Sequence, residues 1–133
     1  MEIQITTGET REILDVTERV TSLAAGLADG IVLVSAPHTT VALFVSEFDD
    51  GLRDDFLKIA DRLFQPVRPF SHMRNNNPNT EAHALSALFG TSLVLPVAGG
   101  KIRLGTYQRI LLFELDGPKT RTVSLTHVRS HAG

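Results

Sequence analysis

The stretch Ile110-Leu111-Leu112-Phe113-Glu114-Leu115-Asp116-Gly117-Pro118 decides the fold of this chain. It opens with four consecutive apolar residues, a pattern typical of a strand that is covered on both faces. Asp116-Gly117-Pro118 then predicts a turn, because Gly tolerates positive φ and Pro lacks a backbone N–H donor. Residues 123–128 alternate in the manner of a strand with one buried face. We therefore expect a C-terminal β-hairpin whose first strand lies centrally in a sheet.

Composition is that of an ordinary globular chain of 133 residues, with 42% hydrophobic residues, 21% charged residues and a formal net charge of -2. This length predicts one domain over residues 1–133. The absence of a basic excess argues against nucleic acid as a partner, and no apolar run is long enough to span a membrane. The chain has no cysteine, which excludes disulfides and thiolate metal sites. The N-terminus shows no secretory signal, so we expect a cytoplasmic protein.

The remaining sequence predicts strands and helices that cover this central strand. A strand over residues 3–6 could pair with one over residues 11–16, and Asp15 with Glu18 resembles a capping box. The elements expected next are a helix over 17–28 ended by Gly30 and strands over 31–36 and 41–45. A second helix follows, capped by Asp49 or Asp50, with its apolar face at Leu52, Phe56, Ile59, Ala60 and Leu63. After a polar loop over 65–78 we expect a third helix, capped by Asn79 or Thr80 with an apolar stripe at Leu85, Leu88 and Phe89, and then strands over 91–97 and 101–104. Because several strands are consecutive, we predict an α+β fold with a mixed, largely antiparallel sheet and about three helices.

Three of the five histidines lie at the boundaries of predicted elements, namely His38, His72 and His83. Three histidines with an open fourth position would match a catalytic zinc site. Their spacing does not match a local zinc motif, so three unrelated histidines remain the alternative. His127 lies on the apolar face of the last strand, where we expect a histidine of the core or of an interface.

Charged side chains offer further candidates, each with more than one interpretation. Glu47 follows the strand over 41–45 and is either a ligand or base, or a solvated residue at a helix entrance. Glu114 lies on an apolar strand, which requires a buried partner such as an arginine or marks a site. Arg103, Arg109 and Arg121 could clamp a phosphate or pair with Glu114, although an outward-facing position is the default for each.

Several short motifs occur in the chain in a fixed order. They are His38-Thr39-Thr40, Glu47, His72, Ala82-His83 before Gly90-Thr91-Ser92, Gly105-Thr106-Tyr107-Gln108, and Glu114-x-Asp116-Gly117-Pro118. Together they resemble the YjbQ-like family, also described as secondary thiamine-phosphate synthase enzymes. The resemblance extends from about Ile3 to Val128, and the part from Gly105 to Pro118 is its most specific segment.

The resemblance implies a compact α+β domain that forms homotrimers. It also implies a pocket in which His38, His72 and His83 hold a divalent metal, zinc being the usual ion. The activity implied is weak synthesis of thiamine phosphate from a pyrimidine diphosphate and a thiazole phosphate, with loss of pyrophosphate. In this reading the catalytic residues are His38, His83 and Glu47, and the contacts to a small phosphorylated substrate come from Thr39, Thr40, Asn79, Arg103 and Arg109.

The sequence departs from the family pattern at four places: Ser46 stands for Asn, Pro78-Asn79 for Asp-Asn, Tyr107 for Trp, and Lys119 for Arg. The missing Asp matters most, because loss of a residue that orients a histidine costs about 10–100-fold in metal affinity or activity. Glu47 or Glu81 could replace it. Two alternatives therefore accompany the enzyme hypothesis: a non-catalytic trimeric module that binds a metabolite or anion, and a purely structural role for the histidines.

Overall fold

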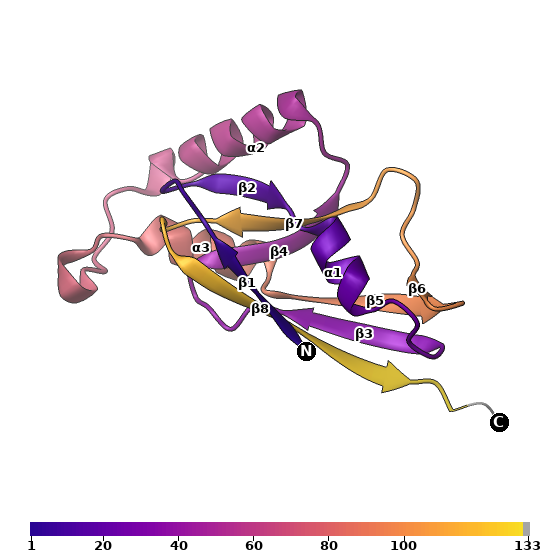
Figure 1. Cartoon of the computed structure of the whole chain (residues 1–133). Coiled ribbons are helices and arrows are strands. Elements are labelled where there is room, and N and C mark those ends of the chain that lie inside the picture. The colour runs from indigo at the N-terminus through magenta and orange to yellow at the C-terminus, as the bar shows by residue number, and fades with distance from the viewer. Residues whose placement is uncertain (132–133) are drawn as a thin grey trace.

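The computed structural model of the chain describes residues 1–131. Figure 1 shows the elements in space. In chain order they are β1 (Glu2–Thr6), β2 (Glu12–Asp15), α1 (Thr17–Leu23), β3 (Gly30–Ser35), β4 (Val41–Ser46), α2 (Asp50–Arg62), α3 (Thr80–Phe89), β5 (Ser92–Ala98), β6 (Lys101–Ile102), β7 (Arg109–Glu114) and β8 (Thr120–Arg129). Two short 3-10 turns, Gln65–Val67 and Arg74–Asn76, lie in the loop between α2 and α3. Within the described chain, every helix is too short or too polar to cross a membrane.

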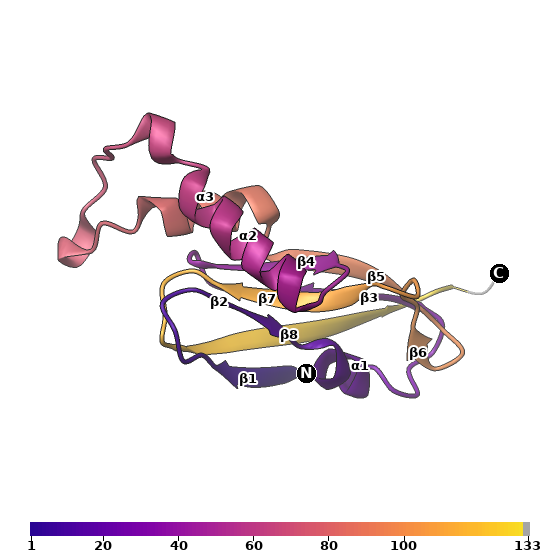
Figure 2. The same ribbon diagram turned by 90° about the horizontal axis from the view of Figure 1, so that it is seen from above.

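The described strands form two sheets. One sheet has the order β1-β8-β3-β5-β6 and the other the order β2-β7-β4. All pairs of neighbouring strands described in them are antiparallel. The two sheets face each other, and α2 and α3 cover the outer face of the three-stranded sheet (Figures 1 and 2). The α+β prediction with three helices is confirmed, and the sheets are antiparallel rather than mixed.

β7 separates two hydrophobic cores. Ile110 and Leu112 point into the core between the sheets, which also contains Val32 and Val34 of β3. Leu111 and Phe113 point the other way, into the core beneath α2 and α3. All four β7 residues are fully buried. The expectation of a central strand covered on both faces is therefore confirmed.

The predicted C-terminal hairpin is wrong. β7 pairs with β2 and β4, whereas β8 pairs with β1 and β3 in the other sheet. The turn at Asp116-Gly117-Pro118 carries the chain from one sheet to the other. The pairing expected between the first two strands is wrong for the same reason, because β1 and β2 also belong to different sheets. Hydrophobic periodicity identifies the buried faces of a strand but does not select its neighbour.

α1 is shorter than predicted. It ends at Leu23 with Ala24 as its C-cap, and Gly30 opens β3 instead of closing the helix. A Cβ at Gly30 would lie 2.1 Å from the Val128 carbonyl oxygen, so a glycine is required there by the close approach of β8. The capping box is also wrong, because the Asp15 side chain accepts hydrogen bonds from the backbone and hydroxyl of Thr17.

The two longer helices follow the prediction more closely. Asp49 is the N-cap of α2, and its carboxylate accepts a hydrogen bond of 2.7 Å from the Leu52 N–H. Phe56 and Ala60 pack into the core beneath α2 and α3. The prediction fails at three positions of the apolar stripes, because Ile59 and Leu63 of α2 are about half exposed and Leu88 of α3 is 69% exposed.

Candidate functional site

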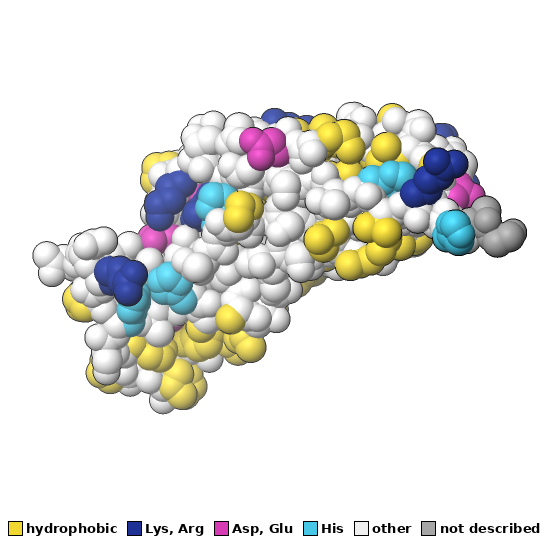
Figure 3. All heavy atoms as spheres, turned by 90° about the horizontal axis from the view of Figure 1, so that it is seen from below, with side chains coloured by type: hydrophobic (Ala, Val, Ile, Leu, Met, Phe, Trp, Pro, Cys, Tyr) yellow, Lys and Arg dark blue, Asp and Glu magenta, His cyan; other side chains and the backbone are white. Residues whose placement is uncertain are grey.

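A pocket of about 600 Å³ opens where the N-terminal end of α3 meets the turns that follow β3 and β7. All the residues that line it have polar or charged side chains. The lining consists of Thr39, Thr40, His72, Arg74, Asn75, Asn77, Asn79, Thr80, His83, Asp116 and Lys119. Figure 3 shows histidine side chains next to Lys or Arg side chains at the end of the molecule that carries the loop between α2 and α3.

The N-terminal end of α3 offers hydrogen-bond donors to this pocket. Asn79 is the N-cap residue, yet its side chain makes no cap hydrogen bond within the described chain. Its amide instead donates to Asp116 Oδ2 at 2.9 Å. Thr80 Oγ1 is buried at this end and has no hydrogen-bond partner among residues 1–131. Free backbone N–H groups and the positive end of the helix dipole together favour an anion here.

His83 is held in one tautomer by the backbone of the turn after β3. Its Nδ1 lies 3.0 Å from the Thr39 carbonyl oxygen. A carbonyl only accepts hydrogen bonds, so Nδ1 donates, and in the neutral ring Nε2 keeps its lone pair. The His72 ring lies beside it, edge-on, with the ring centroids 5.0 Å apart and an interplanar angle of 85°. The pocket thus contains two histidines that meet from different elements.

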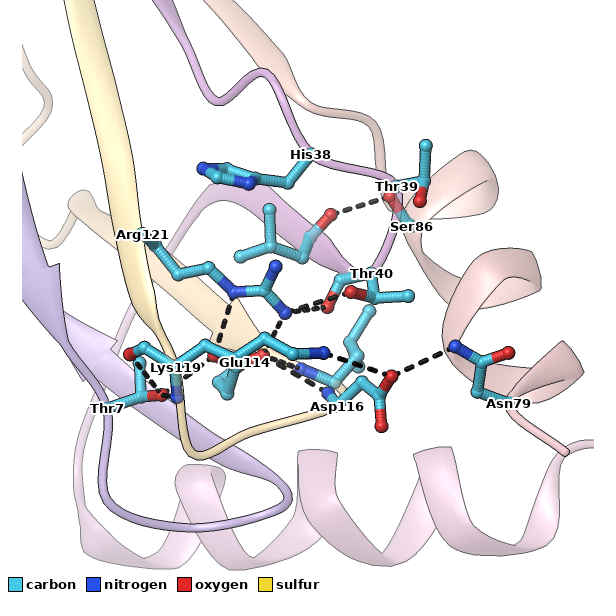
Figure 4. A network of polar contacts seen from close by, with 12 residues as sticks. Thr7, His38, Thr39, Thr40, Asn79, Ser86, Glu114, Asp116, Lys119 and Arg121 are labelled. Carbon is cyan, nitrogen blue, oxygen red and sulfur yellow. Dashed lines mark hydrogen bonds and ion pairs between the residues drawn. The ribbon is translucent and has the colours of Figure 1, made fainter. Parts of the chain in front are cut away.

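Asp116 is the acidic residue of the lining, and it already has partners. Its Oδ2 accepts hydrogen bonds from the amides of Asn77 and Asn79 and from Lys119 Nζ at 3.2 Å. Burial raises the pKa of Asp116, but the bonds from Asn79, Lys119 and Asn77 outweigh it and hold the pKa below its ordinary value. Asp116 is therefore an ionised acceptor that ties the loop before α3 to the turn after β7, as Figure 4 shows for Asn79 and Lys119.

A buried ion pair lies behind the pocket wall and joins the two sheets. Glu114 at the end of β7 is fully buried, and Arg121 of β8 is 4% exposed. Arg121 Nε donates to Glu114 Oε1 at 2.8 Å, and its Nη2 donates to the carbonyl and hydroxyl oxygens of Thr40. Glu114 Oε2 accepts from the backbone N–H groups of Leu115 and Asp116. The interpretation of Glu114 as the partner of a buried arginine is confirmed, and the pair positions Thr40 and Asp116 in the pocket lining (Figure 4).

Hydrogen bonds keep Glu114 ionised in this buried position. Burial alone raises the pKa of Glu114 because it removes water from the carboxylate. Hydrogen bonds from Arg121, from the Thr7 hydroxyl and from the Asp116 N–H oppose this effect, and the pKa lies below its ordinary value. The carboxylate therefore has enough partners to remain charged between the sheets.

His38 lies next to the buried pair and outside the described lining of the pocket. Its Nε2 accepts a hydrogen bond of 2.9 Å from the Thr122 N–H. Burial and the nearby Arg121 charge lower the pKa of His38, so its neutral form is favoured. With Nε2 engaged, the proton of the neutral ring is on Nδ1, and neither nitrogen has a free lone pair.

One chain therefore does not bring the three predicted histidine ligands together. Residues 1–131 contain no cluster of three His, Asp or Glu side chains placed to hold a metal ion. His72 and His83 meet, whereas His38 faces Thr122. The assignment of all three as metal ligands stays a prediction, and its support within one chain is limited to this pair.

The other predicted site residues divide between the pocket and the rest of the surface. Thr39, Thr40 and Asn79 line the pocket. The described lining does not include Glu47, Arg103 or Arg109. Glu47 and Arg103 are exposed, and Arg109 forms ion pairs with Asp15 and Glu18.

Sequence analysis missed Arg74, Asn77, Lys119 and Asp116 as candidate site residues. Arg74 and Asn77 belong to the polar loop over 65–78, whose length was a signal for function. Asp116 and Lys119 belong to the turn that we predicted, but a turn motif does not reveal which pocket its side chains enter.

The fold and this pocket define a class of protein: an α+β sandwich with a polar, histidine-containing pocket at a helix N-terminus. The family model described as "UPF0047 protein YjbQ-like" matches residues 1–130, and the chain belongs to this family. The resemblance noted in the sequence is thereby confirmed. A UPF0047 protein of Archaeoglobus fulgidus is 42% identical over 123 residues, covering 92% of this chain and 96% of the relative. The UPF0047 protein YugU of Bacillus subtilis is 36% identical over 125 residues, covering 90% of this chain and 92% of the relative.

Solved structures show the same fold. A hypothetical protein from Aeropyrum pernix K1 matches with a TM-score of 0.90 and 36% identity over 98% of each chain. A YbjQ-like protein of unknown function from Sulfolobus solfataricus P2 matches with a TM-score of 0.86 and 32% identity, covering 94% of this chain and 92% of that one. The shared architecture is therefore established, and none of these descriptions names an activity.

Proposed function

We propose that the pocket binds a small phosphorylated metabolite and that the protein transfers groups weakly between such metabolites, as a thiamine-phosphate synthase does. The observation that carries the proposal is the charge balance of the lining. Arg74 and Lys119 supply two cations, and the α3 N-terminus adds free donors. Asp116 is the acidic residue of the lining, and Lys119 already neutralises it. A surplus of donors and positive charge favours an anion of high charge density.

The same lining provides groups that a transfer reaction needs. A departing pyrophosphate would be stabilised by Arg74, Lys119 and the helix N-terminus, because each interacts more strongly as negative charge develops. His83 offers Nε2 as a proton acceptor beside the bound substrate, with its tautomer fixed by Thr39. Support for catalysis thus rests on His83 rather than on His38 or Glu47, which lie outside the described lining.

A divalent metal, zinc in first place, is part of the proposal. The fit is partial: His72 and His83 supply imidazole ligands, and the described part of one chain offers no cluster of three metal-ligating side chains. A bound ion would then need oxygen ligands from substrate phosphate or a ligand from a neighbouring copy of the chain. Such an ion would neutralise the charge of a leaving pyrophosphate. Metal analysis of untagged wild-type protein and of the variants His83→Ala and His38→Ala tests this metal site. Stoichiometric zinc that His83→Ala leaves unchanged contradicts a site at His72 and His83.

Binding of inorganic pyrophosphate, measured by calorimetry, tests the pocket directly. We expect Arg74→Ala to weaken binding several-fold. Lys119→Ala should weaken it more, because it also leaves the Asp116 charge uncompensated in the lining. Lys58→Ala is the matched control, since Lys58 is an exposed lysine of α2. Equal loss in the control, or no loss in either pocket variant, contradicts the assignment of the site.

Activity is tested by formation of thiamine phosphate from the pyrimidine diphosphate and the thiazole phosphate. Wild type should show activity that His83→Ala abolishes while pyrophosphate binding remains measurable. Activity that His83→Ala leaves unchanged would indicate a contaminating enzyme. Thermal melts of the histidine variants separate these outcomes from a purely structural role, in which stability falls and ligand binding per folded molecule does not.

A non-catalytic binding module is the second candidate function. The observation in its favour is that the lining, among residues 1–131, offers no unpaired carboxylate as a general base, since Asp116 is held by Lys119 and two amides. Pro78 also stands where the family pattern has an aspartate. Pyrophosphate binding without turnover in the wild-type protein would favour this candidate over the transferase.

We also propose that the protein is a homotrimer. Support comes from the outer face of the five-stranded sheet, where Ile31, Leu33, Val94 and Val128 are between 37% and 63% exposed. Leu33 lies opposite Val94, and Ile31 lies opposite Val128, so these side chains are neighbours. Figure 3 shows hydrophobic side chains gathered on this face. Light scattering should give a trimer that Val94→Glu dissociates; a monomer in the wild type contradicts the proposal.

A further inference from the structure

We infer that His83 is a nucleophile that accepts a phosphoryl group on Nε2 from a phosphoanhydride, forming a phosphohistidine. The inference rests on the proposed function, because it requires the phosphate-binding pocket. It goes further by assigning a covalent modification site and a phosphoryl-transfer step to this chain. Four features of the pocket carry it.

The first feature is the fixed tautomer of His83. The Thr39 carbonyl accepts the Nδ1 proton at 3.0 Å, so the lone pair of the neutral ring is on Nε2. When Nε2 attacks a phosphorus atom, positive charge develops on the ring. The Thr39 carbonyl dipole stabilises this charge through the same hydrogen bond, as the third member of a nucleophile triad does.

The second feature is the position of His83 in the first turn of α3. Its backbone N–H bonds to the Asn79 carbonyl, so the helix N–H groups before it remain for a ligand. The buried Thr80 hydroxyl has no partner among residues 1–131 and adds a donor in the same place. A phosphate on this helix end would bring its phosphorus close to the His83 ring, and proximity of the reacting groups lowers the barrier.

The third feature is the charge opposite the helix. Arg74 and Lys119 lie in the same lining and would stabilise the equatorial oxygens of a transferring phosphoryl group.

The fourth feature is the neighbouring His72, whose ring centroid lies 5.0 Å from that of His83. A ring N–H of His72 would donate a hydrogen bond to the leaving phosphate, which stabilises the negative charge that develops there.

The transfer step balances without an added reductant or oxidant. The Nε2 lone pair forms an N–P bond to the terminal phosphorus of the phosphoanhydride, and the bridging P–O bond breaks. The electron pair of that bond stays on the departing phosphate, which leaves as an anion. Water or an alcohol then attacks the phosphorus of the phosphohistidine and loses its proton to solvent. The N–P bond breaks and its electron pair returns to Nε2.

Two other histidines lack this combination. His38 uses Nε2 to accept from the Thr122 N–H. His127 donates from Nε2 to the Ala28 carbonyl at 2.9 Å and lies outside the described pocket lining. Of the two histidines that line the pocket, His83 is the one whose Nδ1 is engaged by a backbone carbonyl, and this leaves Nε2 as its nucleophilic nitrogen.

The experiment incubates metal-free, full-length protein with inorganic pyrophosphate, which contains the phosphoanhydride bond that the step breaks. Intact mass and peptide mass spectrometry then look for one added phosphoryl group that is acid-labile and base-stable. His83→Asn is the test variant, because the Asn side-chain amide can still donate to the Thr39 carbonyl while Nε2 is removed. His131→Asn, an exposed residue outside the described pocket lining, is the control.

We expect labelling on His83 that His83→Asn abolishes and His131→Asn leaves unchanged. Added zinc should inhibit labelling, because the metal and the phosphoryl group would compete for the same nitrogen. Labelling on another residue, or labelling that survives in His83→Asn, overturns the inference. Absence of labelling while pyrophosphate still binds overturns the inference and leaves the proposed function standing. Absence of pyrophosphate binding to wild type overturns the proposed function as well.

Discussion

Glu114 and Arg121 illustrate at the residue scale how a buried charge is tolerated. Each is expensive to remove from water, and the cost is offset only when hydrogen bonds satisfy both groups. Arg121 donates to Glu114 and to Thr40, while Glu114 also accepts from the Thr7 hydroxyl at 2.7 Å. The consequence is a rigid connection between the two sheets next to the pocket.

Arg121→Met should destabilise the protein by about 3–5 kcal/mol, because it leaves the Glu114 carboxylate buried and unpaired. Arg109→Met is the control, since Arg109 forms its ion pairs on the partly exposed surface with Asp15 and Glu18. We expect that control to cost less than about 1 kcal/mol. Urea unfolding of both variants measures the difference. Equal losses would show that the buried pair is no more important than a surface pair.

His38 should make stability depend on pH. Burial and the Arg121 charge lower the pKa of His38 below its ordinary value of 6.5, so the unfolded chain binds this proton more readily than the folded one. The contribution of His38 to the free energy of unfolding is therefore complete above pH 6.5. It is lost as the pH falls from that value to the lower pKa of the folded state. Glu114 and Lys119 also face this histidine, and their charges oppose each other.

His38→Gln tests this dependence, because its amide oxygen can still accept from the Thr122 N–H but does not titrate. We expect the free energy of unfolding of wild type to fall more steeply than that of His38→Gln between about pH 7.5 and about pH 5.5. Urea titrations at both pH values give the comparison. Parallel slopes would contradict a lowered pKa for His38.

At the scale of elements, α2 and α3 begin in different ways. Asp49 caps α2 with its own carboxylate, whereas Asn79 directs its side chain away from α3 to Asp116. α2 packs on the three-stranded sheet, and α3 turns its uncapped end to the pocket. A helix end that lacks its cap is less stable, and it is the end that can bind an anion.

Asp49→Ala should reduce stability by about 1 kcal/mol, the typical effect of removing an N-cap side chain. Asp50→Ala changes the neighbouring acidic residue, which pairs with Arg53 on the exposed surface of the helix. That control should cost less than about 0.5 kcal/mol. Thermal or urea unfolding distinguishes the two, and a larger effect at Asp50 would contradict Asp49 as the cap.

At the scale of the whole molecule, Gly117 allows the chain to cross from one sheet to the other. A Cβ there would lie 2.3 Å from the Glu9 carbonyl oxygen and 2.7 Å from Glu114 Cγ. The close approach joins the turn after β7 to the loop after β1. Glycine at this position is thus a requirement of tertiary packing.

Gly117→Ala should destabilise the protein by about 1–3 kcal/mol, as overpacking does in a closed structure. Gly51→Ala is the matched control in α2, where a Cβ would have its nearest neighbour at 3.5 Å, an ordinary contact. Alanine there should stabilise by about 0.5–1 kcal/mol because of its helix propensity. Unfolding midpoints that shift in the same direction for both variants would contradict this account.

Much of the fold could be predicted because it depends on local patterns. The apolar run Ile110–Phe113 identified a strand buried on both faces, and the pair Asp49 and Asp50 indicated where α2 begins. Glu114 among apolar residues indicated a buried partner, which is Arg121. Each of these conclusions follows from one segment and the environment that its side chains require.

The candidate site could be predicted only in part. His72, His83, Thr39, Thr40 and Asn79 meet at the pocket. Arg103 and Arg109, which we expected to contact phosphate, lie outside the described lining within one chain, and Arg109 pairs with α1 and the end of β2. Sequence order does not show which charged side chain lies nearest a given pocket.

The sequence by itself determined the order of the main strands and helices, the two buried faces of the central strand, and that the chain resembles the YjbQ-like family. Only the tertiary structure decided that β7 and β8 lie in different sheets, that His38 bonds to Thr122, and that the α3 N-terminus opens on a polar pocket. The physical reason is the sequence separation over which each kind of interaction acts. Periodicity and capping depend on neighbours within a few residues, whereas strand partners and pocket walls are selected by the packing of segments far apart in the chain.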